Sequence, residues 1–102
     1  MLVLMLKKRW FDMILSGVKK EEYRQVSEYW KVRFAKVFPM YPNSFIPTGG
    51  VAVKVEFRNG YGKKVPYFQA MCELSDIRQG KPEWGAEPGK EYYVLRIVEI
   101  LK

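Results

Sequence analysis

The chain has 102 residues, of which 48% are hydrophobic and 28% are charged. This length fits one domain spanning residues 1–102, and this hydrophobic content excludes a disordered chain because burial can offset the entropy lost on folding. Eighteen Lys and Arg against eleven Asp and Glu give a formal net charge of +7, which favours an anionic ligand or a polyanion as partner.

The chain is expected to begin with a strand and a short helix. Residues 2–6, LVLML, form an apolar run that is too short for a helix and ends at charged residues, which is typical of a buried strand. In the following segment, KKRWFDMILSG, the spacing of Phe11, Ile14 and Leu15 places these side chains on one helical face. Gly17 follows the expected end of this helix, where glycine is favoured.

A second helix and a long loop are predicted next. In VSEYWKVRFAKVF, Ser27 is a candidate N-cap, and Trp30, Phe34 and Val37 have the spacing of a buried stripe. Three prolines and two glycines within residues 39–50 predict irregular structure there. A long loop in a small domain often serves function.

The rest of the chain is predicted to form strands separated by loops. VAVKVEF at 51–57 is a strand, and the Asn-Gly pair after it predicts a hairpin with PYFQAMCEL at 66–74. Two prolines and three glycines make residues 75–91 a second predicted loop, and YYVLRIVEIL at 92–101 is the last strand. A few strands with two or so short helices predict an α+β fold, in which a small closed or half-open β-barrel is capped by the helices.

A charged stretch, SGVKKEEYRQV, lies between the two predicted helices. In an extended chain its side chains alternate, so Lys20, Glu22 and Arg24 share one face, whereas Glu21 and Tyr23 form the other, outward face. A lysine, a carboxylate and a guanidinium on one face could line a cleft, because Arg donates to phosphate or carbonyl groups and Glu accepts from amines. The alternative is a solvated edge strand whose charges pair with one another.

Within this stretch, GVKKEEYR matches the pattern GxKxxExR. The chain resembles the ASCH domain family, whose signature has this pattern and whose fold is similar to the small β-barrel of PUA domains. The resemblance is to small prokaryotic and phage members and covers nearly the whole chain. It extends to the segments KKRWFDMILSG, EFRNGYG, GKPEWGAEPG and YYVLRIVEI.

The resemblance implies a cleft between the barrel and the helices that binds RNA or a nucleoside-like ligand. It implies Lys19, Glu22 and Arg24 as cleft residues, and Gly17 as the residue that permits the turn before them. Some members of the family hydrolyse an acyl group from a modified cytidine, and others have been linked to RNA cleavage. In the deacylating members a threonine stands where this chain has Glu22.

Three functions are compatible with these residues. The first is an RNA-binding or other nucleic-acid-binding module, in which Arg58, Tyr61 and Lys63 of the predicted hairpin turn contact the backbone and stack a base. The second is a hydrolase of amidohydrolase or ribonuclease type that acts on a modified nucleoside or on RNA. In that enzyme Lys19 would be the base or would activate the nucleophile, with Glu22 beside it.

The third function is a non-catalytic sensor or adaptor that holds a small anionic ligand or a nucleotide. The loop GKPEWGAEPG would then act as a lid over the ligand. Trp84 of this loop would stack on a ring of the ligand or, alternatively, pin the loop to the core.

Several chemistries are excluded by what the chain lacks. There is no His, and Cys72 is the only Cys, which excludes Ser-His-Asp and Cys-His catalysis and zinc sites that need imidazole or several thiolates. Glu21 and Glu22 are adjacent and face opposite ways in an extended chain, so no intrinsic metal and no cofactor are expected. Cys72 is predicted to fill the core.

The same features predict where the protein works. A lone cysteine cannot form an intramolecular disulfide, which is typical of a reducing compartment. The apolar run after Met1 is too short for the core of a signal peptide or for a membrane span. The protein is therefore expected in the cytoplasm, away from membranes, and as a monomer.

Overall fold

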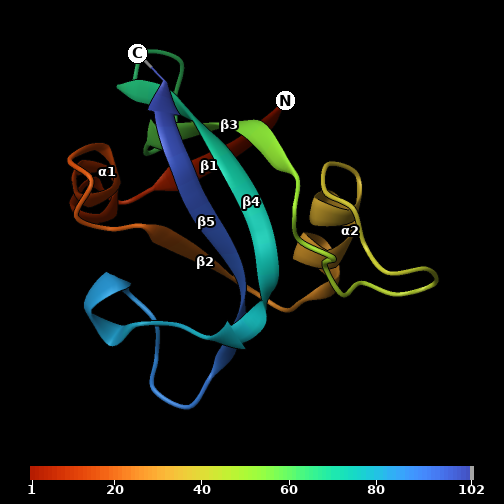
Figure 1. The fold of residues 1–102 in the computed structure, drawn as a ribbon. Coiled ribbons are helices and arrows are strands. Elements are labelled where there is room, and N and C mark those ends of the chain that lie inside the picture. The colour runs from red at the N-terminus through yellow and green to blue at the C-terminus, as the bar shows by residue number, and fades with distance from the viewer. Residues whose placement is uncertain (102) are drawn as a thin grey trace.

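A single five-stranded sheet organises residues 1–101, the part of the chain that the computed structural model describes (Figure 1). The elements are, in chain order, β1 (Leu2–Leu6), α1 (Lys8–Leu15), β2 (Glu21–Gln25), α2 (Glu28–Ala35), β3 (Ala52–Asn59), β4 (Tyr67–Gln79), a 3-10 turn (Pro82–Trp84) and β5 (Glu91–Leu101). β2 crosses the charged stretch, which is therefore extended, as the alternation of its side chains requires.

The sheet has the strand order β1-β3-β4-β5-β2 and curls into a half-barrel. β1 runs parallel to β3, and all other neighbouring strands are antiparallel. β1 and β2 are therefore the two outer strands, and Figure 1 shows α1 and α2 on opposite sides of them. The predicted α+β class with two short helices is confirmed, in the half-open rather than the closed form.

The loop predicted at residues 75–91 is wrong in its first part. β4 continues through Ser75 to Gln79, and Arg78 pairs with Tyr92 of β5. The prolines and glycines that favoured a loop all follow Gln79, so the polar residues before it form a strand because β5 supplies the hydrogen bonds. The ladder shifts register between Leu74 and Asp76, and such a bulge bends the strand around the half-barrel.

Both helices use the buried faces that their spacing predicts, with one exception. Phe11 and Ile14 of α1 are buried, but Leu15, the last residue of this helix, is exposed. In α2 the hydroxyl oxygen of Ser27 accepts a hydrogen bond from the Trp30 N–H at 3.4 Å, which confirms the N-cap. Phe34 is fully buried.

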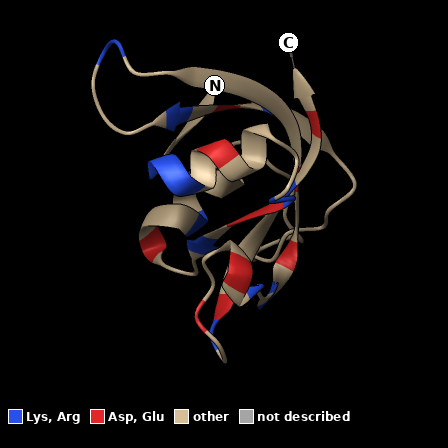
Figure 2. Ribbon diagram, turned by 90° about the vertical axis from the view of Figure 1, so that its left-hand side faces the viewer, with Lys and Arg blue, Asp and Glu red and all other residues tan. Residues whose placement is uncertain are grey.

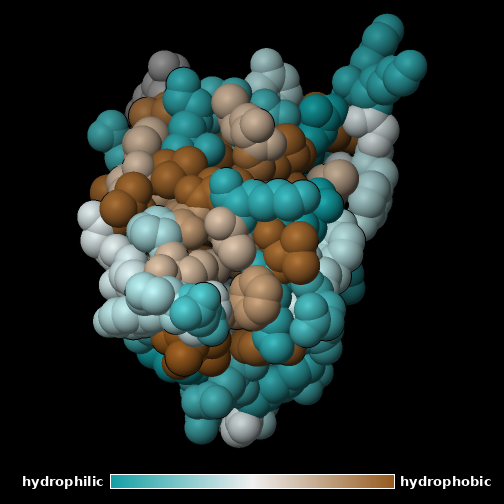
Figure 3. Space-filling model, turned by 90° about the vertical axis from the view of Figure 1, so that its right-hand side faces the viewer, coloured by the Kyte–Doolittle hydropathy of each residue, from teal (hydrophilic) through white to brown (hydrophobic). Residues whose placement is uncertain are grey.

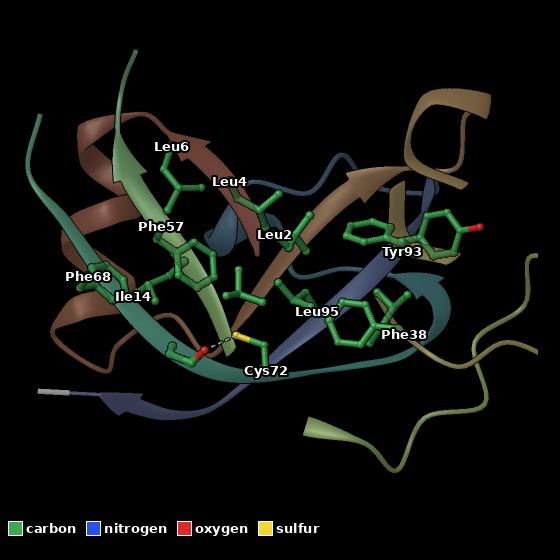
Figure 4. Packing of buried hydrophobic residues seen from close by; sticks show 14 of the residues in the cluster. Leu2, Leu4, Leu6, Ile14, Phe38, Phe57, Phe68, Cys72, Tyr93 and Leu95 are labelled. Atoms are coloured by element: carbon green, nitrogen blue, oxygen red, sulfur yellow. Dashed lines mark hydrogen bonds between the residues drawn. The ribbon is translucent and has the colours of Figure 1, made fainter. Parts of the chain in front are cut away.

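The main core lies inside the curl of the sheet (Figure 4). Leu2, Leu4 and Leu6 of β1 point inward and meet side chains from α1, α2, β3, β4 and β5. Cys72 is fully buried among them, as predicted for a core residue. Burial raises the pKa of its thiol to about 12, so the group stays protonated and unreactive.

A smaller apolar cluster lies outside the curl, under the loop of residues 80–90. Tyr23, Tyr92, Val94 and Ala86 form it, and Trp84 packs against it half-buried. The sheet is thus covered on both faces near β2, which fixes this loop against the charged stretch.

The connection from α2 to β3 is irregular, as its prolines and glycines predict. It is held at two points: the Tyr93 hydroxyl donates to the Phe45 carbonyl at 2.7 Å, and the Glu73 carboxylate accepts from the Gly50 N–H. The N–H of Gly50, together with Arg96, holds the pKa of Glu73 below its ordinary value. Figure 3 looks at the side of the molecule that lies to the right in Figure 1, and it shows apolar side chains gathered on this face with hydrophilic ones between them.

Neither α1 nor α2, nor the 3-10 turn, combines the length and apolar character that a helix needs to cross a membrane, and these are the helices of residues 1–101.

Replacement of Phe34 by Ala is expected to destabilise the fold strongly. The ring is stacked on Trp30 at 5.3 Å between centroids and meets the edge of Tyr93 at 5.2 Å, so its removal leaves a cavity between α2 and the sheet. We expect a loss of about 3–5 kcal/mol of unfolding free energy in urea titrations. Val32 on the same helix is 43% exposed, and Val32→Ala is the control, with a change within about 0.5 kcal/mol. Equal losses in the two variants would contradict this packing.

Candidate functional site

The charged stretch enters the sheet through a turn that requires glycine. Gly17 has φ +84° and donates from its N–H to the Ile14 carbonyl at 3.0 Å, and the N–H of Lys19 returns to the Met13 carbonyl at 2.9 Å. This is the left-handed ending that glycine adopts without strain. The turn directs the chain into β2, where Glu22 pairs with Leu95 of β5.

Three charged side chains then form a continuous ion chain. The Lys19 ammonium lies 3.2 Å from Oε1 of Glu22, and the second carboxylate oxygen of Glu22 accepts from the Arg24 guanidinium at 2.7 Å. Lys19 and Glu22 are buried, and Arg24 is largely covered. The structure therefore brings together the three residues that the resemblance implies, although their charges are directed mainly at one another.

All three N–H groups of the Lys19 ammonium have protein acceptors within reach. Besides Glu22, the ammonium donates to the Glu21 carbonyl at 2.6 Å and to the Trp84 carbonyl at 2.7 Å. It also lies 4.8 Å from the ring centre of Tyr23. Burial lowers the pKa of Lys19, while the neighbouring Glu22 carboxylate works in the opposite direction. With 1% of its surface exposed, Lys19 is a structural cation that joins β2 to the loop of residues 80–90.

The opposite face of β2 is not the outward face that alternation predicts. Tyr23 is 9% exposed, because the loop of residues 80–90 covers it. Its hydroxyl donates to Oε1 of Glu21 at 2.7 Å and accepts from the Lys81 N–H at 3.0 Å. Glu21 also pairs with Arg78. Burial alone would raise the pKa of Glu21, but the hydrogen bonds from Arg78 and Tyr23 outweigh it and hold that pKa below its ordinary value.

Trp84 occupies the position of a pin for this loop. Its ring packs half-buried on the cluster that contains Tyr23, its carbonyl accepts from Lys19, and the Lys81 ammonium lies 4.5 Å from the ring centre. These contacts favour the role of Trp84 in anchoring the loop over a role in stacking on a ligand.

Arg24 joins the two outer strands of the half-barrel. Its NH2 group donates to the Met5 carbonyl of β1 at 3.0 Å, as well as to Glu22 of its own strand. The guanidinium also lies 5.0 Å from the ring centre of Trp30 on α2. Its Nε is buried and has no hydrogen-bond partner among the residues described.

Three adjoining hollows run along β1, and Met5 and Tyr61 line all three. Their volumes are about 90, 380 and 520 Å³. We call them together the β1 groove, which is lined by Val3, Met5, Leu6, Lys7, Lys8, Arg24, Tyr29, Trp30, Arg33, Arg58, Asn59, Gly60, Tyr61, Gly62 and Lys63. This lining contains six cations and no carboxylate. Figure 2 shows basic residues at the start of α1 and at the hairpin loop on one side of the molecule.

The hairpin residues that the sequence indicated all line the β1 groove. Arg58 pairs with Glu56 at 3.2 Å and donates to the Gly62 carbonyl at 2.9 Å, so it also orders the hairpin. Tyr61 is 84% exposed, and Lys63 lies beside it in the 380 Å³ hollow. The structure thus brings Arg24 and Tyr61 together in the β1 groove. Lys19 and Trp84 do not line this groove and contact each other through the Trp84 carbonyl.

Sequence reasoning missed the contributions of β1 and of its neighbours to this groove. Met5 lies in an apolar run that predicts only a strand, and Tyr29 lies in a segment that predicts only a helix. Lys7 and Lys8 follow β1 directly and line the 520 Å³ hollow. The one signal in the sequence was that these lysines follow the apolar run directly, which places positive charge at the end of the predicted strand.

Within residues 1–101, no three Cys, Asp or Glu side chains are grouped closely enough to hold a metal ion. Comparison with known proteins gives no further guide to the site: no family model, no curated protein and no solved structure matches this chain.

Removal of the buried ammonium is expected to destabilise the protein. Lys19→Met leaves the carbonyls of Glu21 and Trp84 without their donor and Glu22 with one cation instead of two. We expect a loss of about 3–5 kcal/mol in urea unfolding, together with faster proteolysis in residues 80–90. Lys20 is exposed, and Lys20→Met is the matched control, for which we expect little change. Wild-type stability in the Lys19 variant would show that this contact is dispensable.

The Glu21 carboxylate is expected to make stability depend on acid pH. Its pKa in the folded state lies below the ordinary 4.5, so its contribution is complete above that pH and is lost as the pH falls through the folded value. Glu21→Gln should therefore be less stable than the wild type at pH 6, and the difference in unfolding free energy should shrink below pH 4.5. Urea titrations across this range test it, with Glu83→Gln as an exposed control. If the difference in unfolding free energy between the wild type and Glu21→Gln stays constant with pH, the Glu21 carboxylate does not cause the pH dependence.

Proposed function

We propose that this chain is an ASCH-like domain of PUA-like fold that binds single-stranded RNA or a nucleotide in the β1 groove. The observation that carries the proposal is the lining of the groove, in which six cations and three aromatic side chains occur without a carboxylate. Three of these cations, Lys7, Arg33 and Lys63, belong to none of the ion pairs of the described chain. They are available to phosphate groups.

The aromatic side chains favour a nucleic acid over other anions. Tyr61 is 84% exposed at the hairpin, and an exposed ring beside cations suits a base that stacks while its phosphates are neutralised. Single strands expose the faces of their bases, and proteins that recognise RNA sequences mostly bind such unpaired segments. The match to GxKxxExR supports RNA as the nucleic acid.

The geometry supports binding more than hydrolysis. Lys19, the residue that would act as base, is enclosed by Glu22 and by two carbonyls, so all three N–H groups of its ammonium are engaged within the protein. Arg24, in contrast, lines the β1 groove directly. In this proposal Lys19 and Glu22 hold Arg24 in position, and Arg24 touches the ligand.

Binding of a short single-stranded RNA should fall steeply with salt. For about three phosphate contacts we expect the logarithm of the affinity to decrease by about two for each tenfold rise in salt. Fluorescence anisotropy of a labelled RNA decamer measures this slope. An affinity independent of salt, or no binding at low salt, would remove the basis of the proposal.

Tyr61→Ala should weaken RNA binding without affecting the fold. Loss of one stacked base costs about 1–3 kcal/mol, which is a decrease in affinity of roughly 5- to 150-fold. Tyr41 is 55% exposed and lies outside the groove, so Tyr41→Ala is the control and should bind as the wild type does. Equal affinities of the two variants would mean that the base does not stack at the hairpin.

A further inference from the structure

The 90 Å³ hollow at one end of the β1 groove is formed around the guanidinium of Arg24. The NH2 group of Arg24 makes the hydrogen bonds to Glu22 and to the Met5 carbonyl, whereas Nε is buried with no partner in residues 1–101. A buried N–H without an acceptor is costly in a protein interior. NH1 makes no hydrogen bond among the described residues either, so this terminal group of the guanidinium keeps donors for a ligand in the hollow that Arg24 lines.

A second guanidinium lines the same hollow. Arg33 lies 4.7 Å from the ring centre of Tyr29 and 5.8 Å from that of Trp30, and Trp30 is also the ring that Arg24 covers. Both guanidiniums thus pack on the aromatic side chains of one helix end. Glu22 compensates Arg24 in part, but no ion pair of the described residues includes Arg33. The hollow carries an excess of positive charge.

The strand edge adds main-chain donors to these cations. The Met5 carbonyl points toward Arg24, away from β3, and in a strand the N–H and C=O of one residue point to the same side. The peptide groups of Met5 and, two residues before it, of Val3 therefore face the hollow that these residues line. Two guanidiniums and strand-edge N–H groups are the donors that bind phosphate oxygens.

The three hollows of the β1 groove differ in size, so they suit different parts of a ligand. The 90 Å³ hollow is the smallest of the three, and its two guanidiniums suit a phosphate group better than a base. The adjoining hollows of 380 and 520 Å³ have the size of sites that hold small organic ligands, and they share Tyr61 with the small one.

We propose that the 90 Å³ hollow is a phosphate subsite, in which Arg24 and Arg33 bind one phosphate group while the base and sugar lie in the larger hollows beside Tyr61. The inference rests on the proposed function and narrows its ligand class. The groove takes nucleotides or phosphate-bearing RNA, and it discriminates against free nucleosides. The phosphate is either a terminal phosphate or a phosphodiester within an RNA strand, since both present charged non-bridging oxygens to the guanidiniums.

The test compares ligands with and without the phosphate on three forms of the full chain: wild type, Arg33→Gln and Lys36→Gln. Lys36 lies about one turn beyond Arg33 and carries the same charge. Both residues line a neighbouring hollow of about 300 Å³, but only Arg33 lines the 90 Å³ hollow, so Lys36→Gln matches the loss of charge but not of the subsite. The probes are a labelled single-stranded RNA hexanucleotide, with nucleoside 5′-monophosphates and the corresponding nucleosides as competitors. Thermal unfolding of each variant verifies that it is folded.

In the wild type we expect a monophosphate to compete at least about tenfold better than its nucleoside. Arg33→Gln should reduce this ratio to about one, and Lys36→Gln should leave it unchanged while weakening the hexanucleotide slightly. Hexanucleotides with a 5′-phosphate and with a 5′-hydroxyl distinguish the two sources. Tighter binding of the phosphorylated form means a terminal phosphate, whereas equal binding that Arg33→Gln weakens more than Lys36→Gln means an internal one.

The subsite is refuted if the hexanucleotide binds with the expected salt dependence but Arg33→Gln and Lys36→Gln behave alike toward every probe. That result would leave the proposed function in place. Failure of the wild type to bind the hexanucleotide at low salt would refute the proposed function itself, and the subsite with it.

Discussion

The arrangement of the charged stretch and of the loop that covers it depends on one buried ammonium, that of Lys19. Moving a charge out of water costs several kcal/mol even after the protein relaxes, so Lys19 is stable in its place only because a carboxylate, two carbonyls and an aromatic ring surround it. These partners come from β2 and from the loop of residues 80–90. The same contact therefore fixes the end of α1, the first residues of β2 and the loop that covers them.

The ion chain carries this constraint to the opposite edge of the sheet. Glu22 is held by Lys19 and in turn orients Arg24, and Arg24 reaches the Met5 carbonyl on β1. A closed barrel would join its outer strands by a ladder of backbone hydrogen bonds. Here a side chain joins β1 and β2 and keeps them in a fixed relation, and the same side chain lines one end of the β1 groove.

The sequence predicts the helices and strands better than it predicts which segments pack against each of them. Local spacing predicts both helices and four of the strands, and alternation places Glu22 and Arg24 on one face of the fifth. Alternation cannot say what covers the other face, so the burial of Tyr23 under residues 80–90 is a tertiary fact. The continuation of β4 through Asp76 and Arg78 depends on pairing with β5, and the proline- and glycine-rich composition that follows obscures it.

The residues of the candidate site that lie in one short segment were predictable from the sequence. The contacts between residues from distant segments were not. Arg58, Tyr61 and Lys63 stand out in the sequence because a hairpin turn exposes them. Their meeting with Arg24 at Met5 joins residues that are far apart in the chain, and it follows from the parallel pairing of β1 with β3. The enclosure of Lys19 was not predictable for the same reason, since its partner Trp84 lies 65 residues away.

The outer position of β1 also bears on how copies of this chain behave toward each other. An outer strand with unpaired peptide groups can add a strand from another molecule and so begin aggregation. The Met5 carbonyl is already occupied by Arg24, and a strand arriving at this edge would have to displace that guanidinium and leave its charge unsolvated. Lys7 and Lys8 add repulsion at the end of the strand. Arg24, which lines the β1 groove, thus also obstructs the addition of a strand at this edge of the sheet.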